Sequence, residues 1–470
     1  MIGKLSSPSI YTLRNFLYEV GEMKAGEGLM EEIAKEYLRN GIAKWGVLYI
    51  DGHFWPYYGM YLISKGWHEV RKIPMKGSYI FIGVDEKFTP WIFLVRPSSE
   101  DLLQKIPEII EKAKNKGREA GISEEQIENL IVIFDREGYS AELYRELEGS
   151  WNLNKKRKAI FISWAKYSDK WVNEICEEKF DKSVVINYEI QESEELKYFE
   201  TERSMSKYGK IRTIVIQSGA EKKRFAIYTN GSEKEIKAEI IVQLICKRWG
   251  EENLIKELLY KHMIDYSPGY ETEELKEQPM IDNPEITKLK KERGNLISKI
   301  NLMKIKIADN LLASEEGKKS KEKREAEETE IKAEIAILNH QVLKINEEIE
   351  KLPKEVRYDE VHSGEKLVKL NYERKRFLDC VKIFVYNMER KMCEYLSKYY
   401  DKKKEIWPAL MMIVRRGAYI KLEGRKLKVI LRRFKNQEID YAARHLCEEL
   451  NQMKPYTSDR FHLPIHYEVM

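Results

Sequence analysis

Two short apolar runs, at 45–50 and 130–134, each end in an aspartate, Asp51 and Asp135. Runs of this length and composition predict strands buried on both faces. The order of strands and helices around them indicates an α/β layered fold. Further strands are predicted at 79–84 and 91–95, and further helices at 9–40, 100–120 and 140–147.

The pattern changes twice in the middle of the chain. Between 158 and 232, four strand-like runs separated by polar turns predict a β-rich insertion. The helical period returns at 236–262, so we expect a first part of the core at 45–157 and a second part at 233–284. Ahead of the core, residues 1–44 are expected to form a helical amino-terminal region.

Heptad spacing dominates the segment from 285 to 355. Apolar residues recur at alternating steps of four and three along 331–349, and a matching series runs along 289–307. A charged stretch, 315–327, joins the two series. The sequence therefore predicts an antiparallel coiled-coil hairpin, which serves either as a solvated arm or as a partner-binding surface. Residues 356–470 are predicted to form a small α+β carboxy-terminal region with a long helix and a β-hairpin.

Composition narrows the class of protein. The chain has 470 residues, 43% of them hydrophobic, which predicts two to four folded domains rather than a disordered protein. Five cysteines without a Cys-x-x-Cys pair predict free thiols in a reducing compartment. Neither a signal peptide nor a run of about 18 apolar residues is present, so we expect a soluble, cytoplasmic protein with no membrane partner.

Charge is balanced over the whole chain but not locally. The net charge is only +5, whereas residues 402–435 hold 12 Lys or Arg and two acids. Such clustering on a predicted hairpin is typical of double-stranded DNA binding, although a solvated strand edge carries lysines too. The candidate DNA-binding residues are Arg415, Arg416, Lys421, Arg425, Lys426, Lys428, Arg432 and Arg433, with Lys155, Lys156 and Arg157 as a smaller cluster.

Asp51 and Asp135 are the residues that the strand pattern singles out as a candidate site. Parallel strands place their carboxyl ends at one edge of a sheet, so the two carboxylates are expected to lie together. Neighbouring carboxylates repel each other, which makes a divalent cation their natural partner. The alternative is that each aspartate only ends a strand or caps a following helix.

Three motifs in order resemble one family. They are Ile50-Asp-Gly-His53, Phe134-Asp-Arg-Glu-Gly-Tyr-Ser140 and Arg248-Trp-Gly-Glu-Glu-Asn253. Together they are similar to the motifs of DDE transposases of bacterial insertion sequences, which belong to the ribonuclease-H-like superfamily. The resemblance spans roughly residues 5–450.

The resemblance implies a ribonuclease-H-like core that cleaves DNA at insertion-sequence ends and transfers the strands. It implies catalytic and metal-binding roles for Asp51, Asp135 and Glu252, with two Mg²⁺ or Mn²⁺ ions. It also implies a homodimer that is associated with the nucleoid. Arg248 is expected either to contact phosphate or to pair with Glu252, one helical turn away. Glu251, Asn253 and His53 are expected to support the site.

Departures from the family leave alternatives open. Glu251 stands where the family usually has glutamine, so Glu251 and Glu252 compete for one role, and the Arg-x3-Glu spacing favours Glu252. Only about 44 residues precede the first catalytic strand, which fits either a transposase with a short amino-terminal region or a truncated copy of one. The competing functions are an inactive transposase remnant that still binds DNA and, less favoured, a structural coiled-coil protein.

Overall fold

A computed structural model describes residues 9–100, 102–149, 157–187, 193–218, 222–275, 277–315, 321–362, 364–457 and 461–470. The chain forms two compact units. The first comprises residues 1–59, 64–271 and 370–470, and the second comprises 60–63 and 272–369. Each unit has its own packing, and we describe them in turn.

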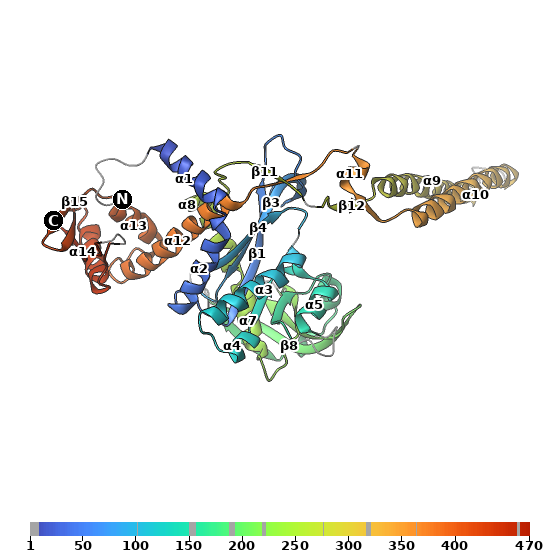
Figure 1. The fold of residues 1–470 in the computed structure, drawn as a ribbon. Helices are drawn as coiled ribbons and strands as arrows, with labels where there is room; N and C mark the ends of the chain where they lie inside the picture. Colours follow the sequence, from blue (N-terminus) through green and yellow to red (C-terminus); the bar gives the residue numbers. More distant parts are fainter. Residues whose placement is uncertain are drawn as a thin grey trace. The chain divides into compact units, whose positions relative to one another are not determined.

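A large mixed sheet organises the first unit (Figure 1). Within it, the strands run in the order β4–β3–β1–β5–β6. Strand β3 is antiparallel to both of its neighbours, whereas β1, β5 and β6 are mutually parallel. The bounds are β1 Val47–Pro56, β3 Ile73–Val84, β4 Pro90–Pro97, β5 Ile131–Phe134 and β6 Ile160–Trp164, and a short β2, Lys65–His68, pairs with the first residues of β3.

The β-rich segment continues this same sheet. Strand β6, which the sequence analysis placed at the start of an insertion, pairs in parallel with β5. Four antiparallel strands then extend the sheet in the order β10–β9–β8–β7. This part is therefore an extension of the core sheet rather than a separate layer. The bounds are β7 Lys182–Ile186, β8 Glu194–Met205, β9 Gly209–Ser218 and β10 Arg224–Thr229.

Helices pack on this sheet through apolar faces. Helix α3, Leu102–Glu119, buries Ile106, Ile109 and Ile110 completely, as its helical spacing predicts. Ser140 caps the helix that follows β5 by accepting a hydrogen bond from the Leu143 amide. The other helices of this part are α4 Glu124–Glu128, α5 Ala141–Glu148, α6 Asp169–Asn173, α7 Ala238–Lys247 and α8 Trp249–His262.

The amino-terminal helices pack on a helix from the far end of the sequence. Helices α1, Ile10–Glu22, and α2, Ala25–Arg39, contact α12, Glu373–Leu396. A Cβ on Gly26 would lie only 2.5 Å from the Glu373 carbonyl oxygen, so the close approach of α2 to α12 requires glycine. Helix α12 therefore belongs to the first unit together with the sheet, although its sequence follows the helical hairpin.

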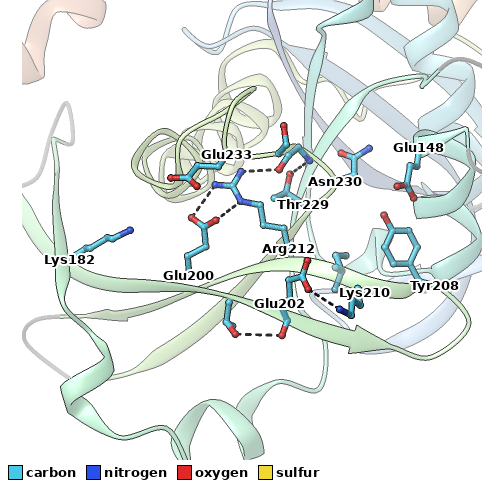
Figure 2. Close-up of a pocket in the computed structure, with 14 residues that line it drawn as sticks. Glu148, Lys182, Glu200, Glu202, Tyr208, Lys210, Arg212, Thr229, Asn230 and Glu233 are labelled. Atoms are coloured by element: carbon cyan, nitrogen blue, oxygen red, sulfur yellow. Dashed lines mark hydrogen bonds and ion pairs between the residues drawn. The ribbon is translucent and has the colours of Figure 1, made fainter.

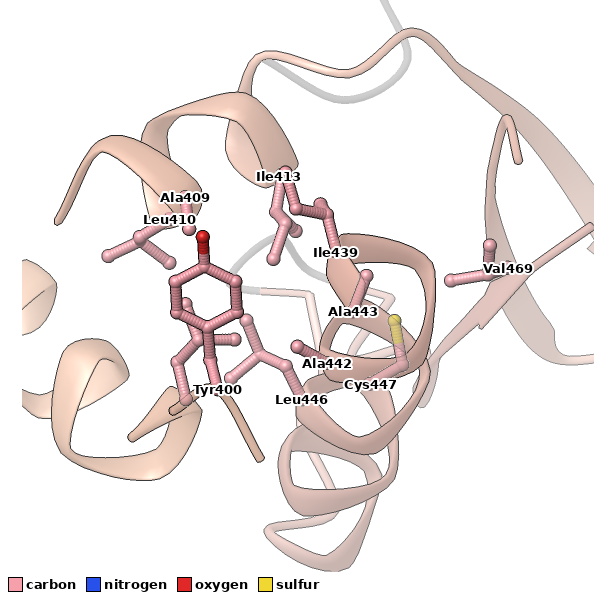
Figure 3. Packing of buried hydrophobic residues seen from close by; sticks show 11 residues of the cluster. Tyr400, Ala409, Leu410, Ile413, Ile439, Ala442, Ala443, Leu446, Cys447 and Val469 are labelled. Atoms are coloured by element: carbon pink, nitrogen blue, oxygen red, sulfur yellow. The ribbon is translucent and has the colours of Figure 1, made fainter. Parts of the chain in front are cut away.

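The carboxy-terminal part of this unit has a small apolar core of its own (Figure 3). Leu410 of α13 and Ala443 of α14 are fully buried there, together with Leu396 at the end of α12. Strands β15, β16 and β17 form, in that order, a three-stranded sheet against these helices. The bounds are α13 Ile406–Val414, β15 Ala418–Glu423, β16 Lys426–Leu431, α14 Gln437–Gln452 and β17 Ile465–Val469.

The second unit is dominated by two long helices, α9 Pro284–Glu315 and α10 Lys321–Lys351. Cross-helix hydrogen bonds join Arg293 to Asn346 at 2.9 Å and Asn310 to Glu327 at 3.2 Å, which shows that the helices are antiparallel. Shielded residues recur at alternating steps of three and four on both helices. Two-stranded pairs hold the base of this unit: β11 Thr272–Glu274 with β14 Val368–Leu370, and β12 Met280–Asp282 with β13 Glu355–Arg357.

The five cysteines are free thiols, as their spacing predicts. Among the helices of the described residues, none is both long and apolar enough to cross a membrane.

Candidate active site

The sheet brings Asp51 and Asp135 to neighbouring positions. Strands β1 and β5 are parallel, and Ile50 is paired with Phe134 at the end of their common ladder. The next residue on each strand is the aspartate, so the two carboxylates follow the same register. Asp135 directly follows β5, as predicted, but Asp51 does not end its strand: β1 continues past it to Pro56 along β3, and only its ladder with β5 stops at Ile50.

The surroundings of Asp51 oppose its negative charge. The pKa of its carboxyl is raised from 3.8 to about 7, mainly by burial, and the nearby Asp135 and Glu137 carboxylates contribute to this rise. The Arg248 guanidinium and a 2.8 Å hydrogen bond from the Gly52 amide act in the opposite direction. A pocket that holds several acids close together in a shielded place stabilises added positive charge.

Asp135 stands at the position of a helix cap, but it does not act as one. It precedes a short 3₁₀ turn, Arg136–Gly138, and its side chain makes no capping hydrogen bond to that turn. Instead, one carboxylate oxygen lies 3.8 Å from the Arg248 guanidinium. The side chain therefore faces Arg248 rather than the turn, which disfavours the capping alternative for Asp135.

Arg248 lies at a break that the sequence did not predict. Residues 236–262 were expected to form one helix, but α7 ends at Lys247 and α8 begins at Trp249. The buried Tyr49 hydroxyl donates a 2.9 Å hydrogen bond to the Leu244 carbonyl, the oxygen that a regular helix would pair with the Arg248 amide. That amide donates instead to Ile245, one residue closer. A side chain inserted into the helical ladder explains the break.

The third predicted acid lies on α8. The backbones of Glu251 and Glu252 are helical, but their side chains fall outside the described part of the structure. Asn253 is described and is exposed. Among the side chains that are described, no cluster of three or more His, Cys, Asp or Glu could hold a metal ion. Asp51 and Asp135 are thus the two predicted ligands whose side chains the structure places.

His53 lies on the same face of β1 as Asp51, because alternate residues of a strand share a face. Its Nε2 atom is 2.8 Å from a carboxylate oxygen of Asp265, in the loop that follows α8. The neighbouring Ile264 carbonyl accepts a hydrogen bond from the buried ammonium of Lys375, which also pairs with Asp379 of α12. Sequence reasoning proposed a supporting role for His53 but found no signal for Asp265 or for the α12 pair.

The predicted basic hairpin is present and largely exposed. Strands β15 and β16 pair in register, and Gly424 has the positive φ of +60° that its tight turn requires. All of β15 is exposed. Not every cation is available, because Lys421 and Lys428 both pair with Glu423, at 3.0 and 2.8 Å.

The arginines that flank the hairpin also have structural contacts. The Arg416 guanidinium donates to the backbone carbonyls of Arg432 and Arg433 and stacks on Phe434. Arg432 stacks on Tyr419 with 5.2 Å between its guanidinium carbon and the ring centre. Arg415, Arg425, Lys426 and Arg433 complete the predicted set.

The smaller basic cluster is only partly described. Lys155 and Lys156 fall outside the described residues. Arg157 pairs with Glu235 at 2.6 Å, and this pairing holds the pKa of Glu235 near 2. Arg157 therefore already has a carboxylate partner in the protein alone.

A separate polar cavity of about 600 Å³ opens on the sheet extension (Figure 2). The side chain of Arg212 lies across it, bonded to Glu200 and to the Gly231 and Ile236 carbonyls. None of the predicted site residues lines this cavity. Its arginine is held by internal partners, so we assign it a structural role.

Comparison with known proteins identifies the class. The profile of a family described as "Transposase protein" matches residues 1–461, and the chain belongs to this family. A search of curated proteins found no match. A similar solved structure is the piggyBac transposase in a synaptic complex with hairpin DNA, with 12% sequence identity and a TM-score of 0.27. That similarity covers 47% of this chain and 43% of that chain.

Proposed function

We propose that this transposase cuts and rejoins DNA with a metal-dependent carboxylate site formed by Asp51, Asp135 and Glu252. The observation that carries the proposal is the parallel register of β1 and β5, which sets the first two acids side by side. The pKa of Asp51, raised to about 7 by burial, supports a site that is completed by cations.

The strand order supports a ribonuclease-H-like core. In β4–β3–β1–β5–β6, strand β1 is central, β3 is antiparallel to it, and β5 and β6 are parallel to it. The two described acids lie on these central parallel strands, Asp51 within β1 and Asp135 directly after β5. We therefore propose that the extension β7–β10 is an elaboration of this core.

The donor set fits Mg²⁺ or Mn²⁺. Carboxylate oxygens are the ligands that these hard cations prefer, and Asp51 and Asp135 supply them from adjacent strands. Two such ions supply activation of the attacking oxygen and charge stabilisation at the leaving oxygen. Glu252, or its neighbour Glu251, would provide the remaining carboxylate from α8.

The other residues of the site would bind and orient the substrate. Arg248 is 5% exposed and lies beside Asp135, so its guanidinium can contact a phosphate held between the acids and α8. His53 would keep β1 and the loop after α8 together through Asp265. Neither role requires proton transfer by these two side chains.

The basic hairpin is the proposed contact with double-stranded DNA. Arg425 lies in its turn and Lys426 begins β16, and neither forms an ion pair with an acid among the described ion pairs. Each phosphate contact lowers the slope of log affinity against log salt by about 0.9. Replacing both residues with alanine should therefore make this negative slope less steep by about two and weaken binding, without reducing the free energy of unfolding. An unchanged slope would show that the hairpin is a solvated strand edge that does not contact DNA.

The helical hairpin is proposed to be an antiparallel coiled coil. Its shielded residues recur at steps of three and four, which is the spacing of a heptad seam. We propose that the active form is a homodimer with this arm as a candidate interface. Sedimentation of the full chain beside a variant that lacks residues 290–346 would test the assignment, because loss of the arm should leave only monomer.

Cleavage by the purified protein tests the central proposal. The substrate is linear DNA that carries the sequences flanking the reading frame, incubated with Mg²⁺ or Mn²⁺. Asp135→Ala should abolish cleavage while DNA binding persists, and Asp169→Ala, on a helix of the sheet extension, is the matched control that should cleave normally. Binding by the wild type without cleavage in either metal would favour the alternative, an inactive remnant that binds DNA.

A further inference from the structure

Phe88, in the turn between β3 and β4, has a backbone conformation that phenylalanine rarely adopts. Its φ is +58°, in the left-handed region, where a bulky side chain is strained. Glycine would form the same turn without that strain. Strained residues persist where the surrounding structure holds them, and they cluster at functional sites.

Two sets of hydrogen bonds hold this turn. The carboxylate of Asp85, which is fully buried, accepts hydrogen bonds of 2.9 and 2.8 Å from the amides of Lys87 and Thr89. The Arg390 guanidinium of α12 donates to the carbonyl oxygens of Lys87 and Phe88. The backbone that carries the Phe88 ring is therefore fixed both within the turn and from a distant helix.

The ring of Phe88 contacts both β1 and the first turn of α8. Its centre lies 5.3 Å from the centre of the Tyr49 ring. It also packs against Gly250, where a Cβ would lie only 2.5 Å from the Phe88 ring. The absence of a side chain at Gly250 thus lets the ring rest on the backbone of α8, directly before Glu251 and Glu252.

These contacts lie on the face of the sheet that carries the first acid. Tyr49 and Asp51 share one face of β1, because they are alternate residues of the strand. A ring packed between Tyr49 and the backbone at Gly250 limits how closely α8 approaches β1. The spacing matters because a displacement of about 1 Å at a reacting site can lower a rate by about a hundredfold.

We propose that Phe88 is a positioning residue for the third carboxylate of the site. Its ring sets the spacing between β1 and the first turn of α8, and the acid that follows Gly250 takes its place from that turn. Glycine would fit the strained turn better but would leave this spacing unsupported, which explains why a phenylalanine occupies the position. The inference rests on the proposed DNA-cleaving function of the same site.

Phe88→Gly tests the ring separately from the turn, because glycine adopts the same φ and leaves only a gap against α8. The value of kcat for cleavage should fall by about 10- to 100-fold, the usual loss when a group that orients a metal ligand is removed. The KM for DNA should change by less than about two-fold, because substrate binding is not altered. Hydrogen exchange of the α8 amides, measured without DNA or metal, should become faster while exchange in β1 stays unchanged.

Three further variants sharpen the test, and thermal unfolding checks that each is folded. Phe88→Leu refills the gap with an apolar side chain and should restore most of kcat. Arg390→Met keeps the ring but removes the two hydrogen bonds to the turn, so it should lower kcat by a smaller factor, whether or not Phe88→Gly folds. Lys207→Gly relieves a φ of +63° in the turn between β8 and β9 and is the matched control, which should cleave normally.

A loss of kcat at constant KM, with faster exchange in α8 and rescue by leucine, supports the proposal. Normal kcat in Phe88→Gly, or in Arg390→Met if the glycine variant does not fold, would overturn it, as would a loss seen only as a raised KM. In each of these cases cleavage by the wild type leaves the proposed function standing. Absence of cleavage by the wild type in either metal would instead overturn the two together.

Discussion

Replacing Asp51 with asparagine should stabilise the metal-free protein at neutral pH. Burial raises the pKa of Asp51 from 3.8 to about 7, so the folded protein binds this proton more tightly than the unfolded chain does. The stability that the bound proton supplies is fully present below about pH 4 and is lost as the pH rises to about 7. Above pH 7 the folded state carries the whole penalty of a shielded carboxylate.

The size of the effect follows from the shift. A rise of about three pKa units corresponds to about 4 kcal/mol at 1.36 kcal/mol per unit, which is an upper bound. Asp51 keeps some contact with solvent, and shielded sites behave as if their dielectric constant were near 20. We therefore expect a gain of about 1–3 kcal/mol for Asp51→Asn at pH 8 and about zero at pH 4.

Urea unfolding in EDTA at the two pH values measures this difference. Other titrating groups cancel, because each comparison is made between wild type and variant at one pH. Asp169→Asn, on the sheet extension, is the control and should show no pH-dependent gain. A gain of the same size at both pH values, or none at pH 8, would refute the electrostatic reasoning. Adding Mg²⁺ should then stabilise wild type more than Asp51→Asn if Asp51 holds the ion.

Three further substitutions probe the packing around the site, each by urea unfolding. Tyr49→Phe should lower the free energy of unfolding by about 1–3 kcal/mol and reduce cleavage, because a buried helix carbonyl loses its donor; unchanged cleavage would contradict a positioning role. Gly250→Ala should cost about 1–3 kcal/mol, since its Cβ would lie 2.5 Å from a phenylalanine ring, whereas Gly28→Ala, with open space around it, should be neutral or stabilising. Asp379→Asn should cost about 3–5 kcal/mol by leaving the buried Lys375 ammonium without its carboxylate, and a smaller loss would show that water reaches the pair.

Local patterns predicted the central strands and the first two acids well. The apolar runs before Asp51 and Asp135 lie in β1 and β5, because buried parallel strands need continuous apolar sequence, but the sequence did not predict that β1 continues past Asp51 to Pro56. Strand β8, Glu194–Met205, was missed because most of its side chains are polar and few are buried. Its pairing with β7 and β9 comes from tertiary context, which overrides a weak local preference.

Long-range contacts set the remaining features. The break between α7 and α8 depends on a hydroxyl from Tyr49, 195 residues away in the sequence, so no local signal at Arg248 could reveal it. The same holds for α12, whose contacts with α2 depend on a glycine near the start of the chain. The two strand patterns predicted that Asp51 and Asp135 lie near each other, but not the contacts of the elements around them.

The two hydrogen bonds that flank Asp51 explain how β1 can orient α8. Tyr49 and His53 lie two residues to either side of Asp51, on the same face of β1. Tyr49 bonds to the Leu244 carbonyl in the last turn of α7, and His53 bonds to Asp265 in the loop after α8. Helix α8 is thus attached to β1 at both of its ends, with Asp51 between the attachments. A helix held on both sides cannot slide along the strand without breaking one of these bonds, so they fix the backbone of α8 in its position along β1.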